Sequence, residues 1–154
     1  MRDLDHEHHM RQAIEIAKDN PNAPFGTVIV AQETGEVLAE GLNEAERNPI
    51  LHGEVAAILN LAEARPGVDW TRLVLYTTAE PCPMCAGAIL WCGIPHVVFG
   101  TSIGTLKRLG LPQIDLPAEE VAGRSSFGVF ELAGGILEGE CDALFEALAR
   151  HVDG

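Results

Sequence analysis

The sequence predicts an α/β fold in which helices cover both faces of one sheet. Amphipathic helical segments alternate along the chain with short runs rich in β-branched residues, as in proteins that pack helices on a sheet. The 154 residues are close to the commonest size of a single domain. No repeat, low-complexity tract or linker divides them. We therefore expect one domain over residues 1–154.

The sequence predicts a helix followed by a hairpin in the first third of the chain. Apolar residues recur at helical spacing between Asp5 and Lys18, and an Asn-Pro-Asn cluster at 20–22 ends that pattern. Two strands, 26–31 and 36–41, flank a turn at Glu33-Thr34-Gly35. The hairpin supplies the first two strands of the predicted sheet.

The remaining elements alternate between helix and strand. Pro83 stands at a first-turn position, which favours the start of a helix there. The segment 102–126 gives no clear pattern. The expected helices are 53–64, 83–92 and 138–151, and the expected strands are 72–78, 96–100 and 127–133.

The composition narrows the choice of partners and of compartment. A content of 47% apolar residues supports a sizeable core, and a net charge of -13 with scattered basic residues disfavours a long nucleic acid. The N-terminus lacks a signal-peptide pattern, and the longest apolar stretch is too short to span a bilayer. We expect a cytoplasmic protein without a membrane partner, whose four cysteines are metal ligands or core thiols.

Two short motifs at predicted helix starts carry the chemistry. His52 precedes one helix, while Cys82 and Cys85 open another within Pro-Cys-Pro-Met-Cys. Imidazole and thiolate are preferred zinc ligands, and three protein ligands leave the fourth tetrahedral position for water. The unpaired amides at a helix start also favour the thiolate that a metal needs. The sequence therefore predicts one catalytic Zn²⁺ with a bound water or hydroxide, held by His52, Cys82 and Cys85.

Glu54 lies two residues after His52, where its carboxylate can face the same pocket. It is the candidate catalytic acid and base: it would take a proton from the water, and the same carboxyl group would then protonate a ring nitrogen and, in a second transfer, the departing amine. The alternative is an ordinary acid favoured by the helix dipole.

The other histidines and cysteines have simpler interpretations. Cys92 lies about 10.5 Å along the helix from Cys85, too far to share one ion, and Cys141 reads as a buried thiol. A closed structural zinc site stays an alternative. His6, His8 and His9 read as a frayed, solvated helix start, and His96 as a satisfied core or edge histidine.

These motifs give the chain a resemblance to the cytidine deaminase superfamily, whose signature is His-x-Glu followed by Pro-Cys-x-x-Cys. Segments 24–26, 76–82 and 87–89 resemble bacterial guanine deaminases and tRNA adenosine deaminases, whereas 52–54 and 93–95 resemble fungal cytosine deaminases. The resemblance covers most of residues 5–150. It implies a three-layer α/β/α sandwich with a mixed five-stranded sheet, and a homodimer or larger assembly.

The resemblance also implies which residues touch the substrate. Asn43 matches an Asn that hydrogen-bonds the substrate ring, although a strand-end turn is the alternative. Phe25 matches a position in the pocket wall. Gly53 belongs to the same substrate-binding set, as does Glu80, near which a backbone carbonyl would accept a hydrogen bond from the leaving amine.

Some features depart from the relatives. The segment from Asn43 to His52 is two residues shorter than theirs, and 101–106 has no counterpart of the aromatic gate of cytosine deaminases or of the aspartate of guanine deaminases. Trp91 makes the third predicted helix apolar all round, which suggests burial on two sides and a subunit interface.

Three functions remain open at this point. We favour a deaminase of free nucleobases or related aminated heterocycles, of guanine or cytosine type. The alternatives are a tRNA-specific adenosine deaminase, which would need a basic surface groove, and a noncatalytic zinc-stabilised interaction domain.

Overall fold

A computed structural model describes residues 4–153, in which five strands form one mixed sheet. The spatial order of the strands is β2-β1-β3-β4-β5. The strands are β1 (Gly26–Ala31), β2 (Val37–Leu42), β3 (Leu73–Ala79), β4 (His96–Thr101) and β5 (Glu131–Ala133). β1 runs antiparallel to both β2 and β3, whereas β3, β4 and β5 are parallel. The predicted mixed five-stranded sheet is confirmed.

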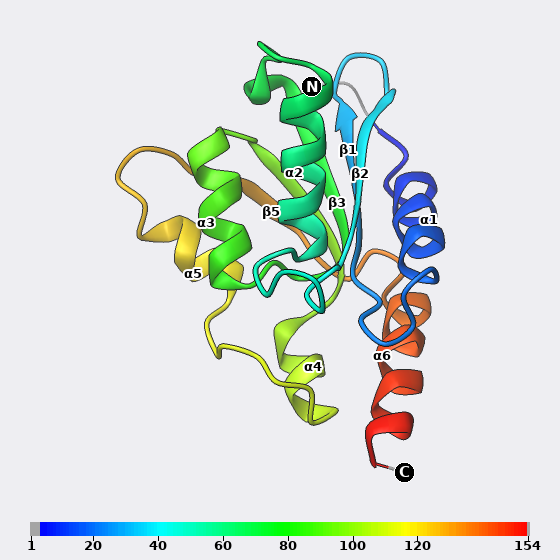
Figure 1. Cartoon of the computed structure of the whole chain (residues 1–154). Coiled ribbons are helices and arrows are strands. Elements are labelled where there is room, and N and C mark those ends of the chain that lie inside the picture. The colour runs from blue at the N-terminus through cyan, green and yellow to red at the C-terminus, as the bar shows by residue number, and fades with distance from the viewer. Residues whose placement is uncertain (1–3, 154) are drawn as a thin grey trace.

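Helices cover both faces of this sheet, so the expected three layers are present (Figure 1). Helices α1 and α6 lie on one face, and α2, α3 and α5 lie on the other. The helices are α1 (His6–Ala17), α2 (Gly53–Ala64), α3 (Pro83–Cys92), α4 (Ile103–Arg108), α5 (Ala118–Gly123) and α6 (Glu138–Asp153), with a 3-10 turn at Trp70–Arg72.

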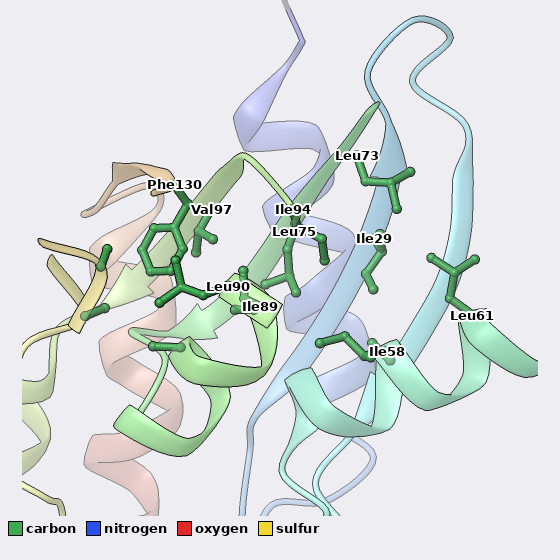
Figure 2. Close-up of a cluster of buried hydrophobic side chains, with 14 residues drawn as sticks. Ile29, Ile58, Leu61, Leu73, Leu75, Ile89, Leu90, Ile94, Val97 and Phe130 are labelled. Atoms are coloured by element: carbon green, nitrogen blue, oxygen red, sulfur yellow. The ribbon is translucent and has the colours of Figure 1, made fainter. Parts of the chain in front are cut away.

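Alternating strand residues divide the core between the two faces. Ile29, Leu75 and Val97 meet the apolar sides of α2 and α3, as Figure 2 shows. Their strand neighbours, among them Val28 and Tyr76, point the other way, toward α1 and α6. Because side chains alternate along a strand, each strand contributes to both halves of the core.

The predicted fifth strand is wrong in extent. It covers only Glu131–Ala133 instead of 127–133, and Phe127 and Val129 are exposed. The pairing partner sets this limit: β4 begins at His96, opposite Glu131, so the residues before 131 have no strand beside them. β-branched and aromatic composition cannot replace a hydrogen-bonding neighbour.

Segment 102–126, whose sequence gives no clear pattern, contains two short helices, α4 and α5, that the sequence did not predict. Six residues are too few for a helical hydrophobic pattern to stand out. Leu106 and Ala118, which are both fully buried, anchor the two helices.

Two predictions about side-chain burial also need correction. His9 is buried and its Nδ1 lies 2.8 Å from Gln12 Oε1, while His6 Nδ1 lies 2.8 Å from the hydroxyl of Tyr76, so the start of α1 is packed instead of frayed. α3 is not buried on two sides within the chain, because Trp91 is 77% exposed and stacks on Phe127.

Two simpler interpretations are confirmed. Cys141 of α6 is a fully buried thiol that packs against the sheet, and His96 Nδ1 lies 3.3 Å from the carboxylate of Glu131. Over residues 4–153, no helix is both long and apolar enough to cross a membrane.

Candidate active site

The chemistry-bearing residues meet at one edge of the sheet, where β3 ends and where α2 and α3 begin. His52 is the N-cap residue of α2, and Cys82 is the N-cap residue of α3. Glu54 and Cys85 lie in the first turns of these helices. The carboxyl edge of parallel strands is the usual place for a site in an α/β protein.

A glycine allows α2 to approach this edge closely. The Cα of Gly41 in β2 lies against the backbone of α2, and a Cβ there would collide with the carbonyl oxygen of Gly53 and with Ala57. Gly53 is equally confined, because a Cβ on it would meet the carbonyl oxygen of Phe25. This close packing places the start of α2 directly beside the start of β1.

The three candidate zinc ligands converge. One ligand atom from each of His52, Cys82 and Cys85 lies within 4.8 Å of the other two, and His52 Nδ1 is 3.5 Å from Cys82 Sγ. Zinc bond lengths of about 2.0–2.3 Å at a tetrahedral angle place such N and S atoms about 3.6 Å apart. The donor set and its spacing therefore fit Zn²⁺.

Among residues 4–153, the cluster consists of these three donors alone. Within the part of the chain that the structure describes, no other His, Cys, Asp or Glu completes the group. Cys141 lies in the core on the α1 and α6 side of the sheet. Three protein donors are the number expected for a catalytic zinc site, whereas a closed structural site has four.

The two thiols differ in their affinity for a proton. Hydrogen bonds that Cys85 and His52 donate to its sulfur lower the pKa of Cys82 to about 4 in the metal-free chain. The same Cys82–Cys85 bond, with burial, raises the pKa of Cys85. The hydrogen bond to Cys82 likewise raises the pKa of His52. These hydrogen bonds favour the thiolate form of Cys82, which is the form that binds a metal.

Glu54 is buried beside this cluster, with 3% of its surface exposed. Burial raises the pKa of its carboxyl group, and the hydrogen bond that Thr77 Oγ1 donates to its Oε1 at 2.9 Å opposes that shift. Thr77 Oγ1 in turn accepts from Thr27 Oγ1 at 3.3 Å. Two hydroxyls from neighbouring strands therefore hold one oxygen of the carboxylate in place.

A cavity of about 160 Å³ opens in front of these groups. One end is formed by His52, Glu54 and Cys82, and the rest of the wall by Phe25, Asn43, Glu80, Pro112 and Gln113. Of the eight predicted site residues, Cys85 and Gly53 do not line the cavity: Cys85 is fully buried, and Gly53 faces β1.

Asn43 combines the two interpretations that the sequence left open. Its Oδ1 accepts a hydrogen bond from the backbone N–H of Ala45 at 3.0 Å, which is a turn of the expected kind. Its side chain also lines the cavity, and among residues 4–153 its Nδ2 has no hydrogen-bond acceptor. The turn therefore fixes the oxygen and leaves the amide N–H groups for a ligand.

Sequence patterns did not predict three residues of the site. Thr77 had a readable signal, because it continues the Leu73 and Leu75 face of β3, where a polar side chain needs a buried partner. Pro112 and Gln113 had no such signal in the sequence. They belong to the segment between α4 and α5, whose path depends on contacts distant in sequence.

Known proteins resemble this chain in sequence and in structure. Residues 4–101 match the cytidine and deoxycytidylate deaminase zinc-binding region. Guanine deaminase of Bacillus subtilis is 34% identical over 129 residues, covering 76% of this chain and 81% of that protein. A probable cytosine deaminase of Schizosaccharomyces pombe is 30% identical over 140 residues, covering 86% and 85%.

Further similarity extends to RNA-modifying enzymes and to a solved structure. The tRNA-specific adenosine deaminase of Bacillus subtilis is 32% identical over 157 residues, covering 95% of this chain and 89% of that protein. The structure of a guanine deaminase from Nitrosomonas europaea has a TM-score of 0.82 at 22% identity, covering 97% of this chain and 87% of that one, which shows the fold.

Proposed function

This chain belongs to the cytidine and deoxycytidylate deaminase family, and we propose that it is a zinc-dependent hydrolase of free nucleobases. The reaction would replace the exocyclic amine of a guanine- or cytosine-type ring, or of a related aminated heterocycle, with a carbonyl oxygen. Water supplies the oxygen, the C–N bond breaks, and the amine leaves as ammonia.

One observation carries the proposal: a buried carboxylate, Glu54, faces the same small cavity as His52 and Cys82, two members of the His-Cys-Cys cluster. The cavity of about 160 Å³ is smaller than the roughly 300–1,000 Å³ that encloses a drug-sized ligand. A single base is the size of molecule that it suits.

The residues at the cluster would divide the chemistry between them. His52, Cys82 and Cys85 would hold one zinc ion, which supplies the Lewis acidity that makes water a nucleophile near neutral pH. Glu54 would accept a proton from the water and deliver protons to a ring nitrogen and to the departing amine. Thr77, hydrogen-bonded to Glu54, keeps one oxygen of that carboxylate fixed.

The other cavity residues would hold the ring. Asn43 Nδ2 can donate to a ring acceptor, and Phe25, packed on Phe145 with ring centroids 5.0 Å apart, offers an apolar wall. We retain a substrate-side role for the backbone near Gly53 and Glu80, the latter accepting from the amine that leaves.

A free base is favoured over tRNA by charge. The chain carries 10 basic and 23 acidic residues, and a phosphate backbone binds chiefly through Lys and Arg. A tRNA-specific adenosine deaminase stays the second candidate, because one such enzyme is 32% identical to this chain.

We also propose a single-domain homodimer that works in the cytoplasm. Support for an interface comes from the exposed Trp91, at 77%, on an otherwise apolar α3. A strictly monomeric sedimentation profile at micromolar concentration would remove the homodimer.

Ammonia release tests the substrate class. The zinc-loaded protein would be assayed with guanine, cytosine, isocytosine, adenine, their nucleosides and a tRNA anticodon stem. We expect ammonia from a free base and none from the stem. Turnover of the stem alone would establish the tRNA enzyme, and no ammonia from any member, with zinc bound, would support the noncatalytic interaction domain.

A further inference from the structure

Part of the cavity wall comes from the connection between α4 and α5, and one carboxylate bonds both ends of the stretch 103–118 that contains α4 and this connection. Ile103, the first residue of α4, donates its backbone N–H to Glu80 Oε1 at 3.0 Å. Ala118, the first residue of α5, donates to Glu80 Oε2 at 2.8 Å. Glu80 therefore closes a loop of sixteen residues, 103–118, at its base.

Glu80 is itself fixed in the sheet. It follows β3 directly, and its backbone N–H donates to Thr101 O of β4 at 2.7 Å. Both oxygens of its side chain are already occupied by backbone donors. The side chain is thus a brace for the segment, while its neighbours Pro81 and Cys82 lead into the zinc cluster.

Gln113 lies within the braced segment and lines the cavity. Leu111, which is buried, anchors the chain two residues before it, and Ala118 anchors the chain after it. The side-chain amide of Gln113 has no hydrogen-bond partner in residues 4–153. It is held at the cavity wall with its donor and acceptor atoms available.

We propose that Glu80 is a positioning residue whose carboxylate holds Gln113 in the cavity wall, and that Gln113 determines specificity by reading a cyclic amide edge of the substrate. An amide side chain offers one acceptor and two donors, so it matches a ring edge with a carbonyl beside an N–H. This inference rests on the proposed function, and it places the carbonyl edge of a guanine- or cytosine-type base against Gln113.

A carboxylate at position 113 would accept hydrogen bonds but could not donate one to a carbonyl. Gln113→Glu should therefore lower kcat/KM for the carbonyl base that the wild type prefers by about tenfold or more, because a polar pair is left unmatched. It should raise relative activity on the analogue in which an amine replaces that carbonyl: 2,4-diaminopyrimidine for cytosine, or 2,6-diaminopurine for guanine. An unchanged ratio would overturn the specificity role of Gln113.

Glu80→Gln tests the brace, since an amide can accept from only one of the two backbone donors and places its own N–H against the other. We expect KM to rise about tenfold with kcat changed much less, zinc content unchanged, and faster amide hydrogen exchange across 103–118. Asp115→Asn is the matched control. It breaks the exposed Lys107–Asp115 ion pair, 2.6 Å long, in the same segment, and should leave KM and exchange unchanged.

The outcomes separate this inference from the proposed function. A wild type without activity on any base would reject the function. A wild type active on a base, with Glu80→Gln indistinguishable from Asp115→Asn, would reject the brace and leave the function standing. If Glu80→Gln does not fold, the Gln113→Glu ratio still decides the specificity role, because Gln113 is partly exposed and bonds no neighbour in the described chain.

Discussion

The two ends of the cavity are built in different ways. The proposed metal end contains His52, Glu54 and Cys82, with Cys85 beside them, and these residues lie on the first turns or caps of two helices packed against the sheet. The proposed substrate end contains Phe25, Asn43, Pro112 and Gln113, which lie outside helices and strands. A rigid metal end with a substrate end built from loops would let one reaction serve different rings.

This contrast makes a general prediction. Changes at the metal end should lower turnover of every base by a similar factor, because they remove the reaction itself. Changes at the substrate end should alter the ratio between bases, because they remove contacts that differ from one ring to another.

The largest effect is expected from Cys85→Ala. Loss of one of three ligands should take zinc from about one ion per chain to nearly none and abolish ammonia release. Cys141→Ala is the matched control, since Cys141 is also fully buried but lies in the opposite core. It should lower stability by about 1 kcal/mol and keep its zinc. Mass spectrometry would measure the zinc content of both variants. Equal zinc loss in both would contradict the assignment of Cys85 as a zinc ligand.

The second-largest effect is expected from Glu54→Gln. The neutral amide cannot carry the proton, so turnover should fall by about 10²–10⁴ for each base, with zinc retained. Glu63→Gln, on the exposed side of the same helix, should leave turnover unchanged. Steady-state kinetics with metal analysis would measure both. Full activity of Glu54→Gln would show that another group moves the proton.

Thr77→Val should have a smaller effect. It removes the hydrogen bond to Glu54, worth about 1.5–3 kcal/mol for a charged acceptor, so kcat/KM should fall about ten- to a hundredfold. Since that bond lowers the pKa of Glu54, its loss raises the pKa further, and the acidic limb of the pH profile should move to higher pH. Thr27→Val keeps the bond to Glu54 and should show little shift. Identical profiles for the two variants would refute the role of Thr77.

The smallest expected effect is that of pH on the alkylation rate of Cys82, which should be nearly flat. In the metal-free protein, with the pKa of Cys82 near 4, the thiolate is present throughout pH 5.5–7.5, so alkylation of Cys82 by iodoacetamide should hardly vary over that range. Burial raises the pKa of Cys92, so its rate should rise about tenfold per pH unit. Peptide mass spectrometry resolves the two sites. A similar rise of the alkylation rate with pH at Cys82 would mean that Cys82 and Cys85 are not coupled as described. Added zinc should protect Cys82 from alkylation.

Local patterns predicted most of the fold but failed where a distant partner decides. The helix 53–64 was predicted with the bounds that the structure shows, because its apolar run and its closing Arg-Pro-Gly are local signals. Phe127 and Val129 looked like strand residues, yet the neighbouring strand β4 begins too late to pair with them. His9 looked solvated, yet it is 4% exposed beside Tyr76, a residue 67 positions away in the chain.

The sequence by itself predicted the metal end, since His52-x-Glu54 and Cys82-x-x-Cys85 are short motifs whose residue types and spacing imply their chemistry. The tertiary structure alone decided that His52 meets Cys82, that Thr77 hydrogen-bonds Glu54, that Glu80 closes the loop 103–118, and that Gln113 reaches the cavity. The physical reason is contact range: within each motif, one helix turn places the side chains relative to one another. A cavity wall is placed by hydrogen bonds and packing between residues far apart in the chain.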